Sequence, residues 1–230
     1  MQVQSRNPDL SPSKSLGLLR LSLALLTLGA IAWQLRIGLS LGMDPVNFFS
    51  YFTNLSNLLA ASVLLVLALD ELLNGGRLAA RPGWQRLRFR SIANMLVVGL
   101  VFAVLLRDVD LGALLPWINF VLHTLMPCAL LLDWWLRPSS ADHGLEISAK
   151  SLGLTLLFPA VYLSIVMLRG SATGWYPYPF LRPDQAGGGM AVSAYALGIA
   201  LSLVVAHVFL RAMARWRLRL SSSPHPDRSQ

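Results

Sequence analysis

The sequence has few charged residues and almost no cysteine, and each shortage removes a class of protein. Only 13% of its 230 residues are charged, whereas about a quarter of the residues in a soluble domain carry charge. Cys128 is the single cysteine, which excludes a disulfide within the chain and a zinc cluster built from thiolates. The composition therefore argues against a soluble globular domain and against a disulfide-stabilised fold.

Common catalytic and nucleotide-binding motifs are also missing. The chain has no Walker or dinucleotide-binding glycine pattern, no HExxH and no GxSxG sequence. A lone histidine within a span does not make a zinc site, because zinc takes three or four ligands. We therefore expect no metal and no cofactor. The net charge of +8 does not indicate nucleic acid, because the arginines lie at the ends of apolar blocks, as membrane topology requires.

Long apolar segments are what the chain has in abundance. Hydrophobic residues make up 55% of it, the mean hydropathy is +0.57, and the apolar blocks reach the length of about 17 residues that crosses a bilayer as a helix. We predict an all-α polytopic membrane protein, a six-helix transmembrane bundle over residues 15–213. The expected spans are 16–41, 46–73, 92–106, 111–136, 151–168 and 190–213.

The connections and tails complete this prediction. Residues 1–14 resemble a disordered tail, residues 77–90 a basic loop, and residues 214–230 a basic and then polar tail. A signal peptide is the competing interpretation of the first span, but its apolar run is long and lacks a clear cleavage site. Pro159 predicts a kink in the fifth span.

The basic residues predict the orientation. An even number of spans places both termini on one side, and all but four of the 19 Lys and Arg residues fall on that side. The four others are Arg36, Arg107, Arg169 and Arg182. Because basic residues are retained in the cytoplasm, we predict cytoplasmic termini and an integral protein of the plasma (inner) membrane.

Two polar segments inside the spans are candidates for a site. Residues 47–59, NFFSYFTNLSNLL, carry polar side chains that are costly in hydrocarbon unless they face the inside of the bundle. The best partner segment is INFVLHT at 118–124, with Asn119 and His123 one turn apart. Counted from the expected outer ends of their spans, Thr53 lies about 10 Å and His123 about 18 Å along the helix. Both can therefore share one cavity in the outer half of the bundle.

Each of these residues has a structural interpretation and a chemical one. Thr53 can bond its own backbone near Phe49, and its polar neighbours can serve hydrogen bonding between helices. His123 can tie two helices together as a neutral imidazole, or it can act as a general base at neutral pH. His207, nearer the inner end of the sixth span, is predicted to be structural or interfacial.

The connection 169–189 contains the aromatic sequence GWYPYPFL at 174–181. Its aromatic residues predict either a belt at the headgroup level or a lid over a lipid-accessible cavity; they are Trp175, Tyr176, Tyr178 and Phe180. Arg169 ends a span beside this loop and is a candidate for binding a carboxylate head group. Arg169, Trp175 and Tyr176 are therefore candidate substrate-binding residues.

Three segments together resemble a known family: FFSYFTNLSNLL, INFVLHTLMPCALLLDW and a span ending in RGSATGWYPYPFL. Over about residues 15–215 the chain is similar to a bacterial family of six-span membrane proteins related to the androgen-induced integral membrane proteins of animals. Animal members of that wider family are intramembrane threonine hydrolases that cleave esters of fatty acids with hydroxy fatty acids. The resemblance implies that Thr53 is the nucleophile and His123 the general base.

Two functions from different classes follow. The first is an intramembrane hydrolase of lipid-like esters that forms an acyl-threonine, with the amides of Asn54, Asn57 or Asn119 as candidate oxyanion donors. The alternative is a non-enzymatic membrane protein that binds a lipid or small solute through the same polar cavity. A transporter is disfavoured, because the sequence suggests no paired buried charges and no obvious inverted repeat. The expected partners are membrane lipids and, for the enzyme, a lipid-like ester substrate; no nucleic acid is expected.

Overall fold

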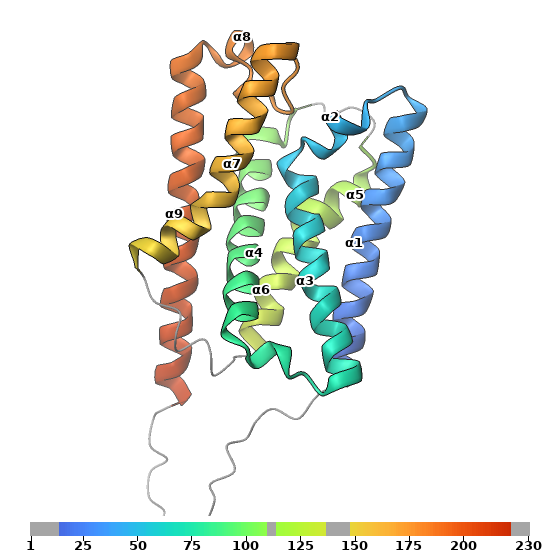
Figure 1. The fold of residues 1–230 in the computed structure, drawn as a ribbon, viewed down its shortest axis with the longest axis vertical. Helices are drawn as coiled ribbons and strands as arrows, with labels where there is room; N and C mark the ends of the chain where they lie inside the picture. Colours follow the sequence, from blue (N-terminus) through green and yellow to red (C-terminus); the bar gives the residue numbers. More distant parts are fainter. Residues whose placement is uncertain (1–13, 110–113, 137–147, 222–230) are drawn as a thin grey trace, which may run out of the picture.

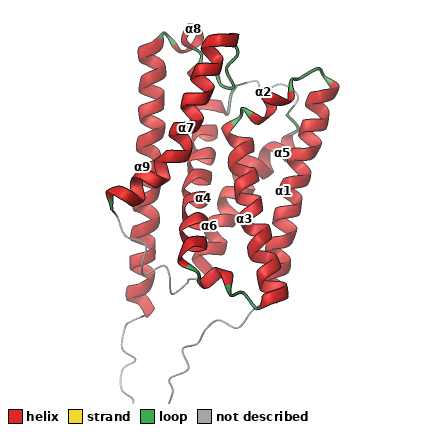
Figure 2. Ribbon diagram, in the orientation of Figure 1, coloured by secondary structure: helices red, strands yellow, loops and turns green. Residues whose placement is uncertain are grey.

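The computed structural model of the chain describes residues 14–109, 114–136 and 148–221. These residues form helices and turns, with no strand among them (Figure 2). Six of the described helical segments are long and apolar enough to cross a membrane. The predicted all-α, six-span architecture is therefore confirmed.

The spans run alternately up and down through the bundle (Figure 1). The first three are α1 (Lys14–Ser40), α2 with α3 (Pro45–Phe49 and Phe52–Asn74), and α4 with the π-helical η2 (Pro82–Val101 and Phe102–Leu106). The fourth joins α5 (Pro116–Phe120), the π-helical η3 (Val121–Leu125) and α6 (Met126–Leu136). The last two are α7 (Ala149–Thr173) and α9 (Gly189–Ser221).

Short elements connect the spans at both ends of the bundle. The 3-10 helix η1 (Leu78–Ala80) precedes α4, while η5 (Pro179–Leu181) and α8 (Pro183–Ala186) lie between α7 and α9. The start of α1 and the end of α9 lie at the same end, the lower one in Figure 1. We call this the terminal end, and the opposite one, which carries α2 and α8, the α8 end.

Several boundaries differ from the sequence prediction. Most of the expected basic loop 77–90 is helical, because α4 begins at Pro82, a residue suited to the first turn of a helix. The fifth and sixth spans also continue beyond residues 168 and 213, to the ends of α7 and α9. Residues 1–13, 110–113, 137–147 and 222–230, which include parts of the predicted tails and loops, lie outside the described residues.

The second span is interrupted, whereas the sequence predicted one helix over 46–73. Asp44 caps α2 by accepting a hydrogen bond from the Val46 N–H, and the helix ends at Phe49. Tyr51 is extended (φ −78°, ψ 123°) before α3 begins. The carbonyl of Ser50 accepts a hydrogen bond from Tyr162 Oη at 2.8 Å, which satisfies a backbone group outside the helix. As a result, α3 starts inside the bundle with its own N-terminus.

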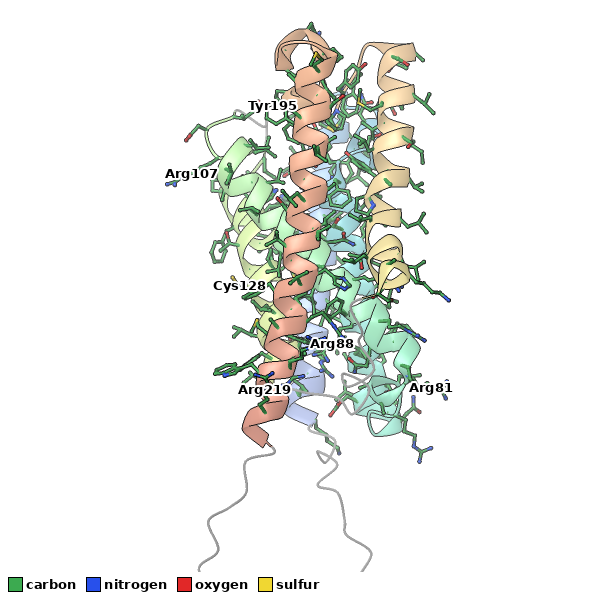
Figure 3. All side chains as sticks on the ribbon, turned by 90° about the vertical axis from the view of Figure 1, so that its left-hand side faces the viewer. Arg81, Arg88, Arg107, Cys128, Tyr195 and Arg219 are labelled. Carbon is green, nitrogen blue, oxygen red and sulfur yellow. The ribbon has the colours of Figure 1, made fainter. Side chains whose placement is uncertain are left out.

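Four helices are joined by a charged cluster that consists of Arg20, Glu71, Arg88 and Asp133. Asp133 on α6 accepts hydrogen bonds from Arg20 Nε at 2.8 Å and from Arg88 Nη2 at 2.5 Å. The Glu71 carboxylate lies 3.5 Å from Arg20, and all four residues are buried. Figure 3 shows Arg88 near the terminal end, together with Arg81 and Arg219. The expectation of no paired buried charges is therefore wrong, because partners far apart in the sequence meet in the bundle.

Pro159 lies inside α7, and Figure 1 shows this helix bent, with its yellow N-terminal part directed away from the bundle. Proline causes such a bend because it removes one helical hydrogen bond and its ring crowds the preceding turn. At the other end, Gly174 closes α7 in the left-handed conformation (φ 72°) and donates its N–H to the Gly170 carbonyl. The chain then enters the aromatic loop at the α8 end.

Candidate active site

Thr53 lies in the first turn of α3, where a backbone N–H has no carbonyl of its own helix to bond. This N–H donates to Tyr178 Oη at 3.2 Å. Thr53 Oγ1 lies 3.4 Å from His123 Nε2 and 3.4 Å from Tyr178 Oη. The hydroxyl therefore faces side chains of two other segments and not the carbonyl of Phe49, which the structural interpretation of the sequence required.

His123 lies on the π-helical segment η3 and is buried. Its ring stacks on Phe102 of the other π-helical segment, η2, with ring centroids 4.2 Å apart and planes 23° apart. The spans that carry Phe102 and His123 approach closely because residue 99 is a glycine. A Cβ at Gly99 would lie 3.2 Å from the His123 carbonyl oxygen. The two irregular helix segments thus meet at the imidazole, and such π segments are frequent at functional sites.

The second ring nitrogen determines the tautomer of His123. Nδ1 lies 3.1 Å from the backbone carbonyl of Asn119. A carbonyl oxygen can only accept, so Nδ1 carries the hydrogen and Nε2 keeps its lone pair. The Thr53 hydroxyl then donates to Nε2. This is the arrangement that a general base needs before it takes a proton from a nucleophile.

Tyr178 is the third side chain of the site, and the sequence analysis assigned it only to the aromatic belt or lid. Its ring stacks on Phe180 with centroids 5.1 Å apart and meets Tyr51 edge to face at 5.6 Å. Burial raises the pKa of the Tyr178 hydroxyl to about 12. The phenol therefore keeps its hydrogen at neutral pH and can donate it.

The loop that carries Tyr178 is seated on α7 through a glycine. The Tyr176 ring packs directly over Gly170 and occupies the place that a Cβ would take. Tyr176, a predicted substrate-binding residue, therefore makes a packing contact that holds the loop. The signal in the sequence was the rigid pattern Tyr-Pro-Tyr-Pro, but nothing in it distinguished Tyr178 from the tyrosine before it.

Two of the three amides predicted as oxyanion donors, those of Asn54 and Asn57, are bonded to the backbone. Asn54 Nδ2 donates to the Phe48 carbonyl at 2.8 Å. Asn57 Nδ2 donates to the carbonyls of Thr53 at 2.9 Å and Leu122 at 3.1 Å. Asn119 contributes its backbone carbonyl to His123. The side chains of Asn54 and Asn57 therefore link α3 to α2 and to η3, and their donors point at backbone carbonyls.

Arg169 and Trp175, both predicted to bind substrate, form a separate cluster at the α8 end. Arg169 Nη2 donates to Asn47 Oδ1 at 2.5 Å and lies 3.7 Å from an Asp44 carboxylate oxygen. Its guanidinium also lies over the Trp175 ring, 5.1 Å from the centroid. Neither residue lines the cavity beside Thr53, so this cluster fastens α2 to the end of α7.

An apolar cavity of about 280 Å³ lies beside Thr53. Only three of its lining residues carry polar side chains, and these are Thr53, Tyr162 and Tyr178. Along α9 the lining runs from Ala196 to Leu203, which is about 10 Å of helix. His123 is not part of the lining, so the Thr53 hydroxyl links the imidazole to the cavity.

One residue of the cavity wall lies at the surface of the bundle. Ala160 of α7 lines the cavity and is also exposed on the surface of the bundle. No group of three His, Cys, Asp or Glu residues close enough to hold a metal occurs in the described ranges. The polar side chains at the cavity carry hydroxyls, and one of these, on Thr53, contacts an imidazole.

Comparison with known proteins identifies the family. A family profile described as FAR-17a/AIG1-like protein matches residues 46–212, a range that contains Thr53, His123 and Tyr178. No curated protein and no solved structure matches the chain. The predicted relation to the androgen-induced membrane proteins is confirmed, since the match covers most of the sequence. The chain belongs to the FAR-17a/AIG1-like family.

Proposed function

We propose that the protein is an intramembrane hydrolase of lipid-like esters, with Thr53 as the nucleophile and His123 as the general base. The observation that carries this proposal is the 3.4 Å contact between Thr53 Oγ1 and His123 Nε2 at the wall of an apolar cavity. The Asn119 carbonyl orients the imidazole, as the third member of a hydrolase triad does. The resemblance to animal threonine hydrolases supports the same two roles.

The reaction is acyl transfer through Thr53. As Oγ1 attacks the ester carbonyl carbon, its proton passes to His123 Nε2 and the carbonyl electron pair moves onto oxygen. The C–O bond to the leaving alcohol then breaks, and the alcohol oxygen takes the proton from His123. Water repeats the sequence on the acyl-threonine, with His123 as base, and releases the carboxylic acid.

The cavity favours an apolar acyl chain as the part of the substrate that binds beside Thr53. Its lining is hydrocarbon apart from the three hydroxyl-bearing residues, so burial of an alkyl chain is favourable and burial of a charged group is not. Access past Ala160 on α7 suits a substrate that enters laterally from the bilayer. Membrane lipids or esters dissolved among them are the corresponding partners.

The charge distribution supports the finer topology. Arg81, Arg88 and Arg219 lie near the terminal end (Figure 3), and basic residues favour the cytoplasmic side of a membrane. Both termini are therefore proposed to be cytoplasmic in a bacterial inner membrane, with the Thr53 site in the outer half. Reporter fusions at each terminus test this, because an alkaline phosphatase fusion that is active at either end contradicts it.

Covalent labelling tests the nucleophile. The purified full chain in detergent is incubated with a fluorophosphonate probe, which forms a stable phosphonate ester with an activated hydroxyl. Labelling of the wild type that disappears in Thr53→Ala, while size-exclusion profiles and thermal midpoints are kept, is the expected result. Mass spectrometry should place the adduct on Thr53.

The same experiment distinguishes the non-enzymatic alternative. A lipid-binding protein with this cavity would bind a fluorescent fatty acid but would neither react with the probe nor hydrolyse activated esters. A wild type that is folded, binds the fatty acid and shows no reaction at any pH between about 6 and 9, where histidine acts as a base, contradicts the hydrolase.

A further inference from the structure

The hydrogen bonds around Thr53 form a chain whose direction is determined at both ends. At one end, the Asn119 carbonyl can only accept, so His123 donates to it through Nδ1 and accepts through Nε2. At the other end, the Thr53 N–H can only donate, so Tyr178 Oη accepts from it at 3.2 Å. Each hydroxyl between these ends has one hydrogen to give.

This leaves one assignment in which every contact is satisfied. The Thr53 hydroxyl gives its hydrogen to His123 Nε2, so Oγ1 must accept from Tyr178 Oη across 3.4 Å. Tyr178 therefore presents an O–H donor to the nucleophile, beside the Thr53 N–H. The two donors are 3.2 Å apart, close enough to converge on one oxygen atom.

We propose that the Tyr178 hydroxyl is a catalytic residue that, together with the Thr53 backbone N–H, forms the oxyanion hole of the hydrolase. This inference rests on the proposed hydrolase function. Both donor groups belong to residues that line the apolar cavity, so an ester carbonyl that enters from the cavity to reach Oγ1 meets them. The amides of Asn54 and Asn57 are already bonded to backbone carbonyls and leave this role open.

The chemical step follows from the geometry. When Oγ1 attacks, the electron pair of the carbonyl double bond moves onto the carbonyl oxygen. The Tyr178 O–H rotates from Oγ1 to this oxygen, and the Thr53 N–H, whose direction the helix fixes, donates to it in place of Tyr178 Oη. Tyr178 keeps its proton throughout, because the proton from Oγ1 goes to His123. Donors in an apolar site stabilise such an anion more than water does.

The surrounding structure holds the phenol in place for this role. Tyr178 stacks on Phe180 and meets Tyr51 edge to face, and its loop is seated on Gly170 through Tyr176. If Tyr178 only filled space, its ring would be enough, and the contacts of its hydroxyl with Thr53 would not be needed. The difference between packing and catalysis therefore lies in one oxygen atom, which phenylalanine lacks.

The test is a kinetic comparison of the full chain in detergent with 4-nitrophenyl octanoate as the probe ester. Tyr178→Phe keeps the ring and its stacking and should lower kcat by roughly 10²- to 10³-fold. KM should change by less than about 3-fold, since a transition-state interaction is lost and ground-state binding is kept. Fluorophosphonate labelling should slow by a similar factor.

Tyr51→Phe is the matched control, since it removes a tyrosine hydroxyl from the same aromatic group. It should leave kcat within about 3-fold of the wild type. A Tyr178→Phe variant with unchanged kcat overturns the inference while the hydrolase stands, and so does a loss that lies entirely in KM. A wild type that neither hydrolyses the ester nor reacts with the probe overturns the hydrolase itself, and the inference with it.

A spectroscopic measurement on the wild type does not depend on the folding of any variant. The acyl-enzyme is formed from an octanoyl ester with carbon-13 at the carbonyl, and its C=O stretch is read by infrared difference spectroscopy. Hydrogen bonds from Tyr178 and the Thr53 N–H should lower the frequency relative to the same ester in an apolar solvent. An unshifted carbonyl band contradicts the proposed oxyanion hole.

Discussion

Among the residues that the structure describes, two threonine hydroxyls contact a histidine ring, and one of these two pairs adjoins the apolar cavity. Thr53 Oγ1 is 3.4 Å from His123 Nε2, whereas Thr155 Oγ1 is 3.1 Å from His207 Nδ1. The pair with the shorter contact is not the candidate site, because neither Thr155 nor His207 lines the cavity beside Thr53. Under the proposed function, contact between a hydroxyl and an imidazole is not sufficient, because the nucleophile must also adjoin a space that a substrate can enter.

The surroundings of the second pair are those of a packed core. Thr155 also lies 3.1 Å from the carbonyl of Ser151, four residues earlier in its own helix, which is the backbone bonding that threonine often makes in membrane helices. His207 is fully buried and meets Phe89 edge to face at 4.9 Å. Phe89 in turn contacts Trp134, next to Asp133 of the charged cluster. The Thr155–His207 pair therefore belongs to the packed core near the charged cluster.

Removal of the two threonine hydroxyls, one at a time, should produce the greatest difference between the two pairs. Thr53→Ala should lower the hydrolysis of 4-nitrophenyl octanoate by about 10⁴-fold or more, because no nucleophile remains. Thr155→Ala should stay within about 3-fold of the wild type and affect chiefly the thermal midpoint. Equal losses in the two variants would show that access to the cavity does not distinguish the pairs.

The histidines give the next largest difference. His123→Ala should lower kcat by roughly 10²- to 10⁴-fold, the usual contribution of a general base. His207→Ala should keep kcat and lose stability, because it leaves a cavity beside Phe89. Single-turnover labelling with the fluorophosphonate separates the two effects, since it reports the reactivity of Thr53 in the folded fraction. Slow labelling in His207→Ala alone would reverse the assignment.

The sequence predicted one pair and not the other for identifiable reasons. Apolar block lengths predicted the six spans, counted depths allowed Thr53 and His123 to share one cavity, and the family resemblance implied their roles. The interruption before α3 was not predictable, because no proline or glycine marks residues 50 and 51. The break is accompanied by the Tyr162 hydrogen bond to Ser50 from another helix. Tyr178 was missed because its contact with Thr53 spans 125 positions and depends on how a loop folds.

The charged cluster extends the comparison from activity to stability. Asp133→Asn removes the negative charge between the guanidinium groups of Arg20 and Arg88, and loss of one partner in a buried ion pair costs about 3–5 kcal/mol. The free energy of unfolding in mixed micelles measures this. Asp44→Asn is the matched control, because the Asp44 side chain is 51% exposed and lies 3.7 Å from Arg169. It should cost at most about 1 kcal/mol, and a similar loss in both variants contradicts the prediction.

At alkaline pH the ionisation of Tyr178 should lower the stability of the folded protein. Burial raises the pKa of Tyr178 to about 12 from an ordinary value of 10.0, so between these values the folded protein holds a proton that the unfolded chain has released. Stability therefore falls as pH rises through this window, by up to about 3 kcal/mol for this group. Comparing the wild type with Tyr178→Phe isolates the contribution, since the other tyrosines remain. A stability gap between the two proteins that is the same at pH 9 and at pH 12 contradicts the predicted window.

Partial filling of the cavity beside Thr53 should change activity least. This cavity adjoins the Thr53–His123 pair and not the Thr155–His207 pair. Ala200 of α9 lines the cavity between Ala196, nearer the α8 end, and Leu203, farther from it. Ala200→Leu should fill part of the cavity along α9. We therefore expect kcat/KM for 4-nitrophenyl laurate to fall by about 10-fold relative to kcat/KM for 4-nitrophenyl butyrate. A few methylene groups in an apolar pocket allow discrimination of this size. Val208→Leu is the matched control, because Val208 is exposed on the same helix and does not line the cavity. An equal loss of activity on both esters would place the acyl chain elsewhere. A selective loss on the longer ester would identify this cavity as the acyl-binding site, and the Thr155–His207 pair does not line it.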